Sequence, residues 1–197
     1  MEKGFVYVIE SPSAVDLLDG ITEGRSLCEA LRLSGIDHWY SLATNRETFS
    51  QSLHDRLGEA LKRFPQKYPL LHLSMHGNDS GVSLTNNEFL SWKELRDVLK
   101  PLTKIMDSSS IICLSYCFGL HGATMAMNEE NDPTFWALIS SSSSISWAEA
   151  AVAYITFYHL FLTKGHSLKE CVKAMQVASG NKGFMYLGGK EVKKHLG

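Results

Sequence analysis

A cysteine and a histidine, each at the end of an apolar run, have the clearest chemical potential in this sequence. Cys117 follows the apolar segment 110–116, and His76 follows the apolar segment 69–75. A cysteine attacks as its thiolate, and a neighbouring imidazole lowers the thiol pKa enough to form the thiolate near neutral pH. The pair therefore predicts acyl transfer in which Cys117 is the nucleophile and His76 moves the proton.

Gly77 directly follows His76 and has no side chain to obstruct a close backbone approach. Its N–H, together with that of Cys117, is predicted to bind the oxyanion that forms when a carbonyl is attacked. Taken singly, these residues also fit a plainer interpretation. A free cysteine is often a small buried hydrophobe, and a histidine after a strand is often a satisfied loop residue.

The elements that must position these residues alternate along the chain. Strands are expected over 5–9, 36–42, 69–75, 110–116 and 135–140, with an edge strand over 184–187; helices are expected over 22–33, 44–61, 91–99 closed by Pro101, 147–163, and after Ser167. This alternation predicts an α/β fold, with a parallel sheet covered on both faces. Such sheets bind ligands beyond the carboxyl ends of their strands, so His76 and Cys117 are expected on one edge.

Composition narrows the classes of protein that need to be considered. The 197 residues, 44% of them hydrophobic, suit a single domain, and the net charge of −2 without a basic run argues against a nucleic-acid partner. Four irregularly spaced cysteines do not form a disulfide framework. The longest apolar stretch, 150–162, is shorter than the roughly 20 residues that span a bilayer. We therefore expect a cytoplasmic protein that does not contact membranes.

Two motifs resemble the paired His-Gly and Cys motifs of caspase-like (clan CD) cysteine peptidases, among them the CHAT-domain group. They are Leu-Leu-His-Leu-Ser-Met-His-Gly at 70–77 and Ile-Ile-Cys-Leu-Ser-Tyr-Cys-Phe-Gly at 111–119. Members of these groups carry a short hairpin and a helix between the two motifs. The likeness covers roughly residues 4–188.

The resemblance implies a three-layer α/β/α caspase-like (CHAT) fold with a central, mostly parallel sheet, as a single peptidase domain over 1–197. It implies that His76 is the general base and acid, that Cys117 is the nucleophile, and that Gly77 and Cys117 donate to the oxyanion. Peptidases of this kind commonly use a dyad and need no metal or organic cofactor. Asp79 is therefore expected to be a solvated loop carboxylate rather than an orienting group for His76.

The substrate-binding residues are also inferred in part from the resemblance. The segment containing Ser146 and Trp147 resembles the segment that lines the substrate cleft of caspases, but Ala148 stands where caspases carry the arginine that receives an acidic side chain. Glu10 and Glu149 are predicted to place negative charge in the first specificity pocket and to favour Arg or Lys before the scissile bond. The alternative for Glu149 is that it opens a helix.

The function implied is that of a cysteine endopeptidase acting on a polypeptide substrate. The resemblance further implies control by a regulatory or sensor protein partner, and a role in bacterial antiviral defence or regulated cell death. A catalytically inactive caspase-like domain that binds a peptide or partner protein is the main alternative. A flavodoxin-like ligand-binding domain fits less well, because the first strand–helix connection lacks a glycine-rich phosphate cradle.

An alternative constellation for these residues is a zinc site built from Cys113, Cys117 and His121, with His72 or His76 as a fourth ligand. It is disfavoured because Cys113 lies inside an expected strand and the Cys-x-x-Cys knuckles of structural zinc sites are absent. Three cysteines are accordingly expected to be structural: Cys28, Cys113 and Cys171.

Overall fold

The structure is a computed structural model, and it describes residues 4–105, 110–116, 119–126 and 135–189. Cys117 and the acidic segment 128–133 lie outside these ranges.

A central sheet with strand order β2-β1-β3-β6-β7-β8 forms the middle layer. Its strands are β1 (Gly4–Ser11), β2 (His38–Leu42), β3 (Tyr68–Asn78), β6 (Ile111–Ser115), β7 (Ala137–Ser141) and β8 (Phe184–Gly188). The first five are mutually parallel, and β8 pairs antiparallel with β7. The prediction of a mostly parallel sheet is confirmed, including the edge strand near the C-terminal end.

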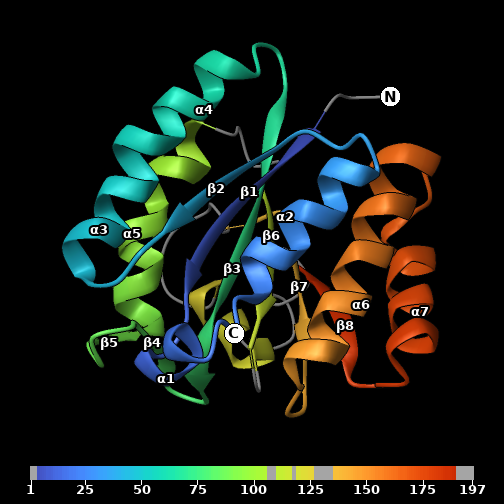
Figure 1. The fold of residues 1–197 in the computed structure, drawn as a ribbon. Helices are drawn as coiled ribbons and strands as arrows, with labels where there is room; N and C mark the ends of the chain where they lie inside the picture. Colours follow the sequence, from blue (N-terminus) through green and yellow to red (C-terminus); the bar gives the residue numbers. More distant parts are fainter. Residues whose placement is uncertain (1–3, 106–109, 117–118, 127–134, 190–197) are drawn as a thin grey trace.

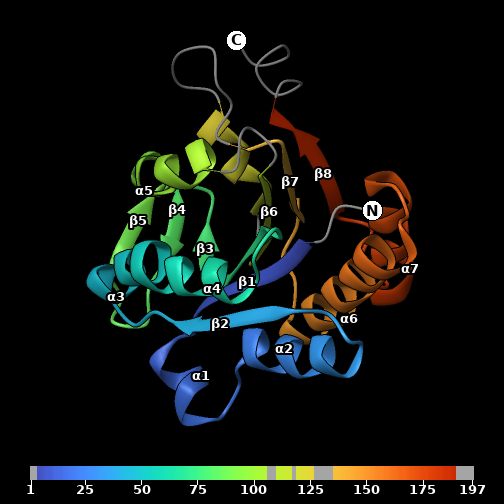
Figure 2. The same ribbon diagram turned by 90° about the horizontal axis from the view of Figure 1, so that it is seen from above.

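Helices cover both faces of this sheet, as Figures 1 and 2 show. One face carries α3 (Arg46–Gln51), the π-helical turn η1 (Ser52–Arg56), α4 (Leu57–Arg63) and α5 (Trp92–Ile105); the other carries α2 (Glu23–Leu33), α6 (Trp147–Tyr158), the π-helical turn η3 (His159–Lys164) and α7 (Leu168–Ser179). Alternate side chains of β1 enter the two hydrophobic cores: Tyr7 and Ile9 face the first group of helices, Val6 and Val8 the second. The predicted three-layer α/β/α architecture is therefore confirmed.

Three local features differ from the expectation. The helix predicted to end at Pro101 continues to Ile105 as α5, because Leu102 beyond the proline is buried in the core and its packing offsets the lost backbone hydrogen bond. The short helix α1 (Ala14–Leu18) buries none of its residues, so it has no apolar periodicity to reveal it. The 3₁₀ helix η2 (Gly119–Ala126) was likewise not predicted.

The β3 strand extends past the sheet into a small hairpin. Beyond the main sheet it pairs antiparallel with β4 (Gly81–Ser83), which in turn pairs with β5 (Phe89–Ser91). This agrees with the hairpin that the family resemblance implied. His76 pairs with Ser83, so the histidine lies where the sheet ends and the hairpin begins.

The strand order places a topological switch point between β1 and β3. The chain leaves β1 for β2 on one side and later returns to β3 on the other side of β1. In open α/β sheets, ligands bind in the crevice outside the carboxyl ends of the strands at such a point. The segments that follow Ser11 of β1 and Met75 of β3 meet there, since these two residues are the last register pair between the strands.

No helix in the described part of the chain is both long enough and apolar enough to cross a membrane.

Candidate functional site

His76 stands at the carboxyl edge of the sheet with half of its side chain, 49%, exposed. It follows His72 and Ser74 at intervals of two along β3, so all three side chains point toward the face covered by α2 and α6. Its position is therefore fixed by a strand that is buried up to Met75.

A carboxylate that the sequence did not predict holds the imidazole of His76. The Nε2 atom of His76 lies 2.6 Å from Oδ2 of Asp16, which is on α1. The same Oδ2 accepts hydrogen bonds from the backbone N–H of Ser13 (3.0 Å) and from its hydroxyl (2.5 Å). Figure 1 shows α1 beside the arrowhead of β3, which is where this contact forms.

The charge on Asp16 decides which nitrogen of His76 is free. Burial raises the pKa of the Asp16 carboxyl, but the hydrogen bonds from Ser13 and His76 outweigh it and hold the pKa below its ordinary value. Asp16 is therefore ionised at neutral pH and accepts from Nε2–H, which leaves Nδ1 as the basic nitrogen of a neutral imidazole. The signal in the sequence was Ser13-x-x-Asp16, a capping pattern directly after the first strand.

Asp79 does not take this role. It is exposed and accepts a hydrogen bond from the hydroxyl of Ser80, while its backbone carbonyl accepts from the indole N–H of Trp92. The interpretation of Asp79 as a loop carboxylate is confirmed. The orienting group is Asp16.

Trp147, the first residue of α6, lies against His76 on a second side. The two ring centroids are 5.2 Å apart at an interplanar angle of 71°, an edge-to-face contact. Ser146 and Glu149 form the capping box of this helix: Glu149 accepts from the backbone N–H of Ser146 (2.7 Å) and from its hydroxyl (2.9 Å). These hydrogen bonds lower the pKa of Glu149. Glu149 was predicted either to line the specificity pocket or to begin a helix, and its place in the capping box favours the second interpretation.

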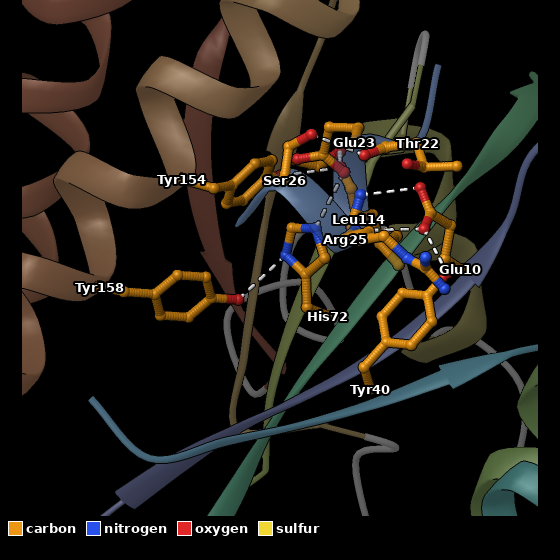
Figure 3. A network of polar contacts seen from close by, with 12 residues as sticks. Glu10, Thr22, Glu23, Arg25, Ser26, Tyr40, His72, Leu114, Tyr154 and Tyr158 are labelled. Atoms are coloured by element: carbon orange, nitrogen blue, oxygen red, sulfur yellow. Dashed lines mark hydrogen bonds and ion pairs between the residues drawn. The ribbon is translucent and has the colours of Figure 1, made fainter. Parts of the chain in front are cut away.

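Glu10 is almost completely buried, with 1% of its surface exposed. Its carboxylate accepts from the backbone N–H groups of Gly24 (2.8 Å) and Arg25 (3.2 Å), in the first turn of α2, and from the hydroxyl of Tyr40 (2.7 Å). Figure 3 shows these contacts. Burial raises the pKa of Glu10 despite them. The Glu10 carboxylate thus accepts hydrogen bonds from the N-terminal turn of α2, and the structure does not bring it to the surface beside His76.

A second buried carboxylate, Glu23, lies in the same turn of α2 and faces His72. Glu23 Oε2 is 3.4 Å from Nε2 of His72, whose Nδ1 is 3.0 Å from the hydroxyl of Tyr158 (Figure 3). Both side chains of the Glu23–His72 pair are fully buried. The other carboxylate oxygen of Glu23, Oε1, is buried and has no hydrogen-bond partner among the residues that the structure describes.

Two buried serines lie between this pair and the exposed edge. Glu10 of β1 pairs with Ser74 of β3, and Ser74 pairs with Ser115 of β6, so a row of polar side chains crosses three adjacent strands. The hydroxyls of Ser74 and Ser115 are buried and lack hydrogen-bond partners within the described ranges. Unsatisfied buried polar atoms are few in folded proteins. In the described part of the chain, three such atoms, including Glu23 Oε1, lie inward of His76 on the face that α2 and α6 cover.

Gly77 lies against the residue that precedes Cys117. A Cβ atom at Gly77 would come within 2.7 Å of the Tyr116 ring and 3.0 Å of the carbonyl oxygen of Gly81. On the other flank of Cys117, a Cβ at Gly119 would meet the Ser140 hydroxyl at 2.1 Å. The described residues on either side of Cys117 are therefore closely packed against β3 and β7. Cys117 itself is outside the described residues.

The other three cysteines are buried free thiols. Burial raises the pKa of Cys28 and Cys113 to about 12 and that of Cys171 to about 11, so all three are neutral near pH 7. The expectation that they are structural agrees with this placement. In the described ranges, no group of three or more His, Cys, Asp or Glu residues is arranged to hold a metal ion.

Comparison with known proteins gives the class of fold. No family model matches the sequence, and no curated protein matches it. Among solved structures, the chain is similar to a secreted C11 cysteine protease from Bacteroides thetaiotaomicron, solved with an irreversible peptide inhibitor: 8% identity, TM-score 0.57, 96% of this chain and 67% of that one. It is also similar to the Arg specific cysteine proteinase gingipain R: 12% identity, TM-score 0.54, 92% of this chain and 43% of that one.

These likenesses show the fold alone: the chain has the α/β fold of these two cysteine proteases. The chain spans less than half the length of gingipain R.

The close packing of Gly77 against Tyr116 and Gly81 can be tested directly by substitution. Replacing Gly77 by alanine should destabilise the protein by about 1–3 kcal/mol, because the added methyl group meets an aromatic ring and a backbone carbonyl. Denaturant unfolding of the purified variant measures the change. Gly58→Ala is the matched control: nothing lies within 4 Å of its Cβ position in α4, so it should stabilise by up to about 1 kcal/mol. Equal stability for the two variants would contradict this packing.

Proposed function

We propose that this protein is a cysteine endopeptidase in which Cys117 is the nucleophile and His76 transfers the proton. The observation that carries the proposal is the hydrogen bond between His76 and Asp16, at the switch point of a fold shared with cysteine proteases. A half-exposed imidazole that is hydrogen-bonded to a mostly buried carboxylate is the arrangement that a general base requires.

Three arguments support Cys117 as the nucleophile. It follows β6, the strand next to β3, in the motif that resembles the cysteine motif of caspase-like peptidases. The residue before it, Tyr116, is the one that Gly77 closely approaches. The remaining cysteines of the chain are buried thiols with raised pKa values, and a thiol of that kind is a poor nucleophile.

The proposed reaction has two steps. The Cys117 thiol gives its proton to Nδ1 of His76, and the thiolate attacks the peptide carbonyl carbon; the imidazolium then protonates the leaving amine as the C–N bond breaks. Water, deprotonated by His76, attacks the thioester and releases the acid and the thiol. The Asp16 carboxylate accepts from Nε2–H throughout and stabilises the imidazolium. Gly77 and Cys117 are proposed to donate their N–H groups to the oxyanion.

We further propose that the first specificity pocket takes a basic side chain. Ser74 and its register partner Ser115 lie two residues inward of His76, about 7 Å along the strand, and Glu23 contacts His72 two residues further in, so only a long side chain would reach this layer. The buried carboxyl groups of Glu10 and Glu23 are proposed to receive the basic side chain there. Trp147, whose ring contacts His76, is proposed as one wall of the entrance, with Ser146 beside it.

The wider context is proposed on the resemblance alone. The protein is proposed to act in the cytoplasm on a polypeptide, under the control of a regulatory or sensor partner, as a CHAT-type effector in bacterial antiviral defence or regulated cell death. No cofactor is required by the chemistry above.

Substituting the proposed nucleophile tests the assignment. Cys117→Ala should abolish cleavage of a peptide library, and His76→Ala should lower it at least a hundredfold, because the thiolate is no longer formed. Mass spectrometry of the products measures the effect. Cys113→Ala, which removes a buried thiol, should retain activity. Full cleavage by the Cys117 variant would exclude the mechanism, and a protein that folds but never reacts with a thiol-directed probe would favour the inactive binding domain.

Substituting Asp16 separates a charged orienting group from a merely structural one. Asp16→Asn should lower kcat about 10- to 100-fold with a small change in KM, because the imidazolium loses its partner. The depressed pKa of Asp16 means that its stabilising contribution is complete above its unfolded pKa, near 4, and is lost as the pH falls through the lower folded value. The difference in unfolding free energy between the wild type and Asp16→Asn should therefore shrink below about pH 4. A difference independent of pH would contradict the charged role.

Peptides that vary only in the residue before the scissile bond test the pocket. Lys or Arg should be cleaved at least tenfold faster than Ala, with Asp the slowest, as expected from the buried carboxylates. Glu23→Gln should reduce the Lys/Arg advantage more than Ser146→Ala does, provided that its unfolding midpoint shows a folded protein. A preference for Asp would contradict the proposed pocket.

A further inference from the structure

A short exposed segment beside His76 carries apolar side chains that the fold does not use. Val15 and Leu18 of α1 are 65% and 85% exposed, and Ile21, just after the helix, is 42% exposed. None of the α1 residues is buried. Adjacent exposed aliphatic groups of this kind are typical of contact surfaces.

The segment is tied directly to the imidazole. Asp16, in the same turn as Val15, holds Nε2 of His76 at 2.6 Å, and the backbone N–H of Ile21 donates to the carbonyl of Asp16 (2.7 Å). The five residues of α1 extend only about 7.5 Å. Its apolar side chains consequently lie within a short distance of the imidazole.

The spacing of these side chains fits an extended peptide. Val15 and Leu18 are one helical turn apart, so their Cβ atoms are separated by about 5–6 Å. Side chains on one side of an extended chain repeat every two residues, about 6.6 Å. A polypeptide with its scissile carbonyl at His76 and its chain running over α1 would place side chains two to four positions away against this surface.

We propose that α1 and Ile21 form a docking surface for apolar side chains of the polypeptide substrate, within four residues of the scissile bond. This rests on the proposed function and adds a requirement on the substrate. Three aliphatic side chains offer at most a few hundred Å², well below the roughly 800 Å² per partner of a stable protein dimer. The size of the surface and its link to His76 both favour a bound peptide over a second copy of the chain.

The experiment uses the full chain with Cys117→Ala, so that binding is read without cleavage. Fluorescent peptides with Leu, Val or Phe near the central bond are compared with matched peptides that carry Ser at those positions. Val15→Ser combined with Leu18→Ser should weaken binding of the apolar peptides about tenfold and leave the Ser peptides unchanged. Leu33→Ser, at an 82% exposed leucine in the last turn of α2, is the control and should change neither.

Several outcomes would overturn the docking surface. The first is equal weakening of binding for both peptide sets, or no weakening for either. The second is the absence of any peptide binding to the Cys117→Ala chain. The third is a loss of self-association when Leu18 is changed, which would assign the surface to a second copy of the chain. An NMR titration of His76 that is unchanged by the double substitution establishes that α1 stays in place. With Cys117 intact, KM should rise for apolar peptides while kcat is unchanged. Cleavage that persists without Cys117 would instead refute the proposed function, and the binding comparison would still stand.

Discussion

The arrangement of the site depends on one hydrogen bond, between Asp16 and His76. Asp16 lies on α1, directly after β1, and His76 follows the part of β3 that pairs in the main sheet, so the bond joins the segments that follow the two strands flanking the switch point. An imidazole that is half exposed has many orientations available to it in solvent. The carboxylate selects one orientation and one tautomer, and it thereby makes Nδ1 the basic nitrogen. The chemistry proposed for Cys117 requires this choice.

The carboxylate is itself held by a local device. Ser13 donates both its N–H and its hydroxyl to Asp16, in a capping box that begins a helix of only five residues. Such a helix is too short to be stable by itself. Because α1 buries no side chain, the capping box and the contact with His76 are the main described interactions that hold it in place. Positioning of the imidazole and formation of α1 are therefore coupled.

The strands of the sheet could be predicted from the sequence because their burial leaves a clear pattern in it. Strands such as β1 and β3 are buried on both faces, so they appear as continuous apolar runs, and His76 marks the point where β3 emerges. Asp16 could not be found in this way, since its role depends on the proximity of two strand ends that only the strand order brings together. Glu10 and Glu149 were predicted as pocket residues from their charge, yet both carboxylates accept hydrogen bonds at helix N-termini. An isolated acidic residue in a sequence does not reveal whether its partner is a ligand or a backbone N–H.

The buried polar layer beneath His76 has a cost that the fold does not explain. Carboxylates are expensive to bury unless they are paired, and burial, with a smaller contribution from the neighbouring Glu23, raises the pKa of Glu10. Glu10 accepts from two backbone N–H groups and a tyrosine hydroxyl, whereas Glu23 has, among the described residues, an imidazole contact at 3.4 Å and an oxygen without a partner. A purely structural layer would be more stable with apolar residues of similar volume. Buried carboxyl groups and acceptors without a partner among the described residues are the feature expected of a site that a cationic group completes, and this is why we propose that the layer receives a substrate side chain.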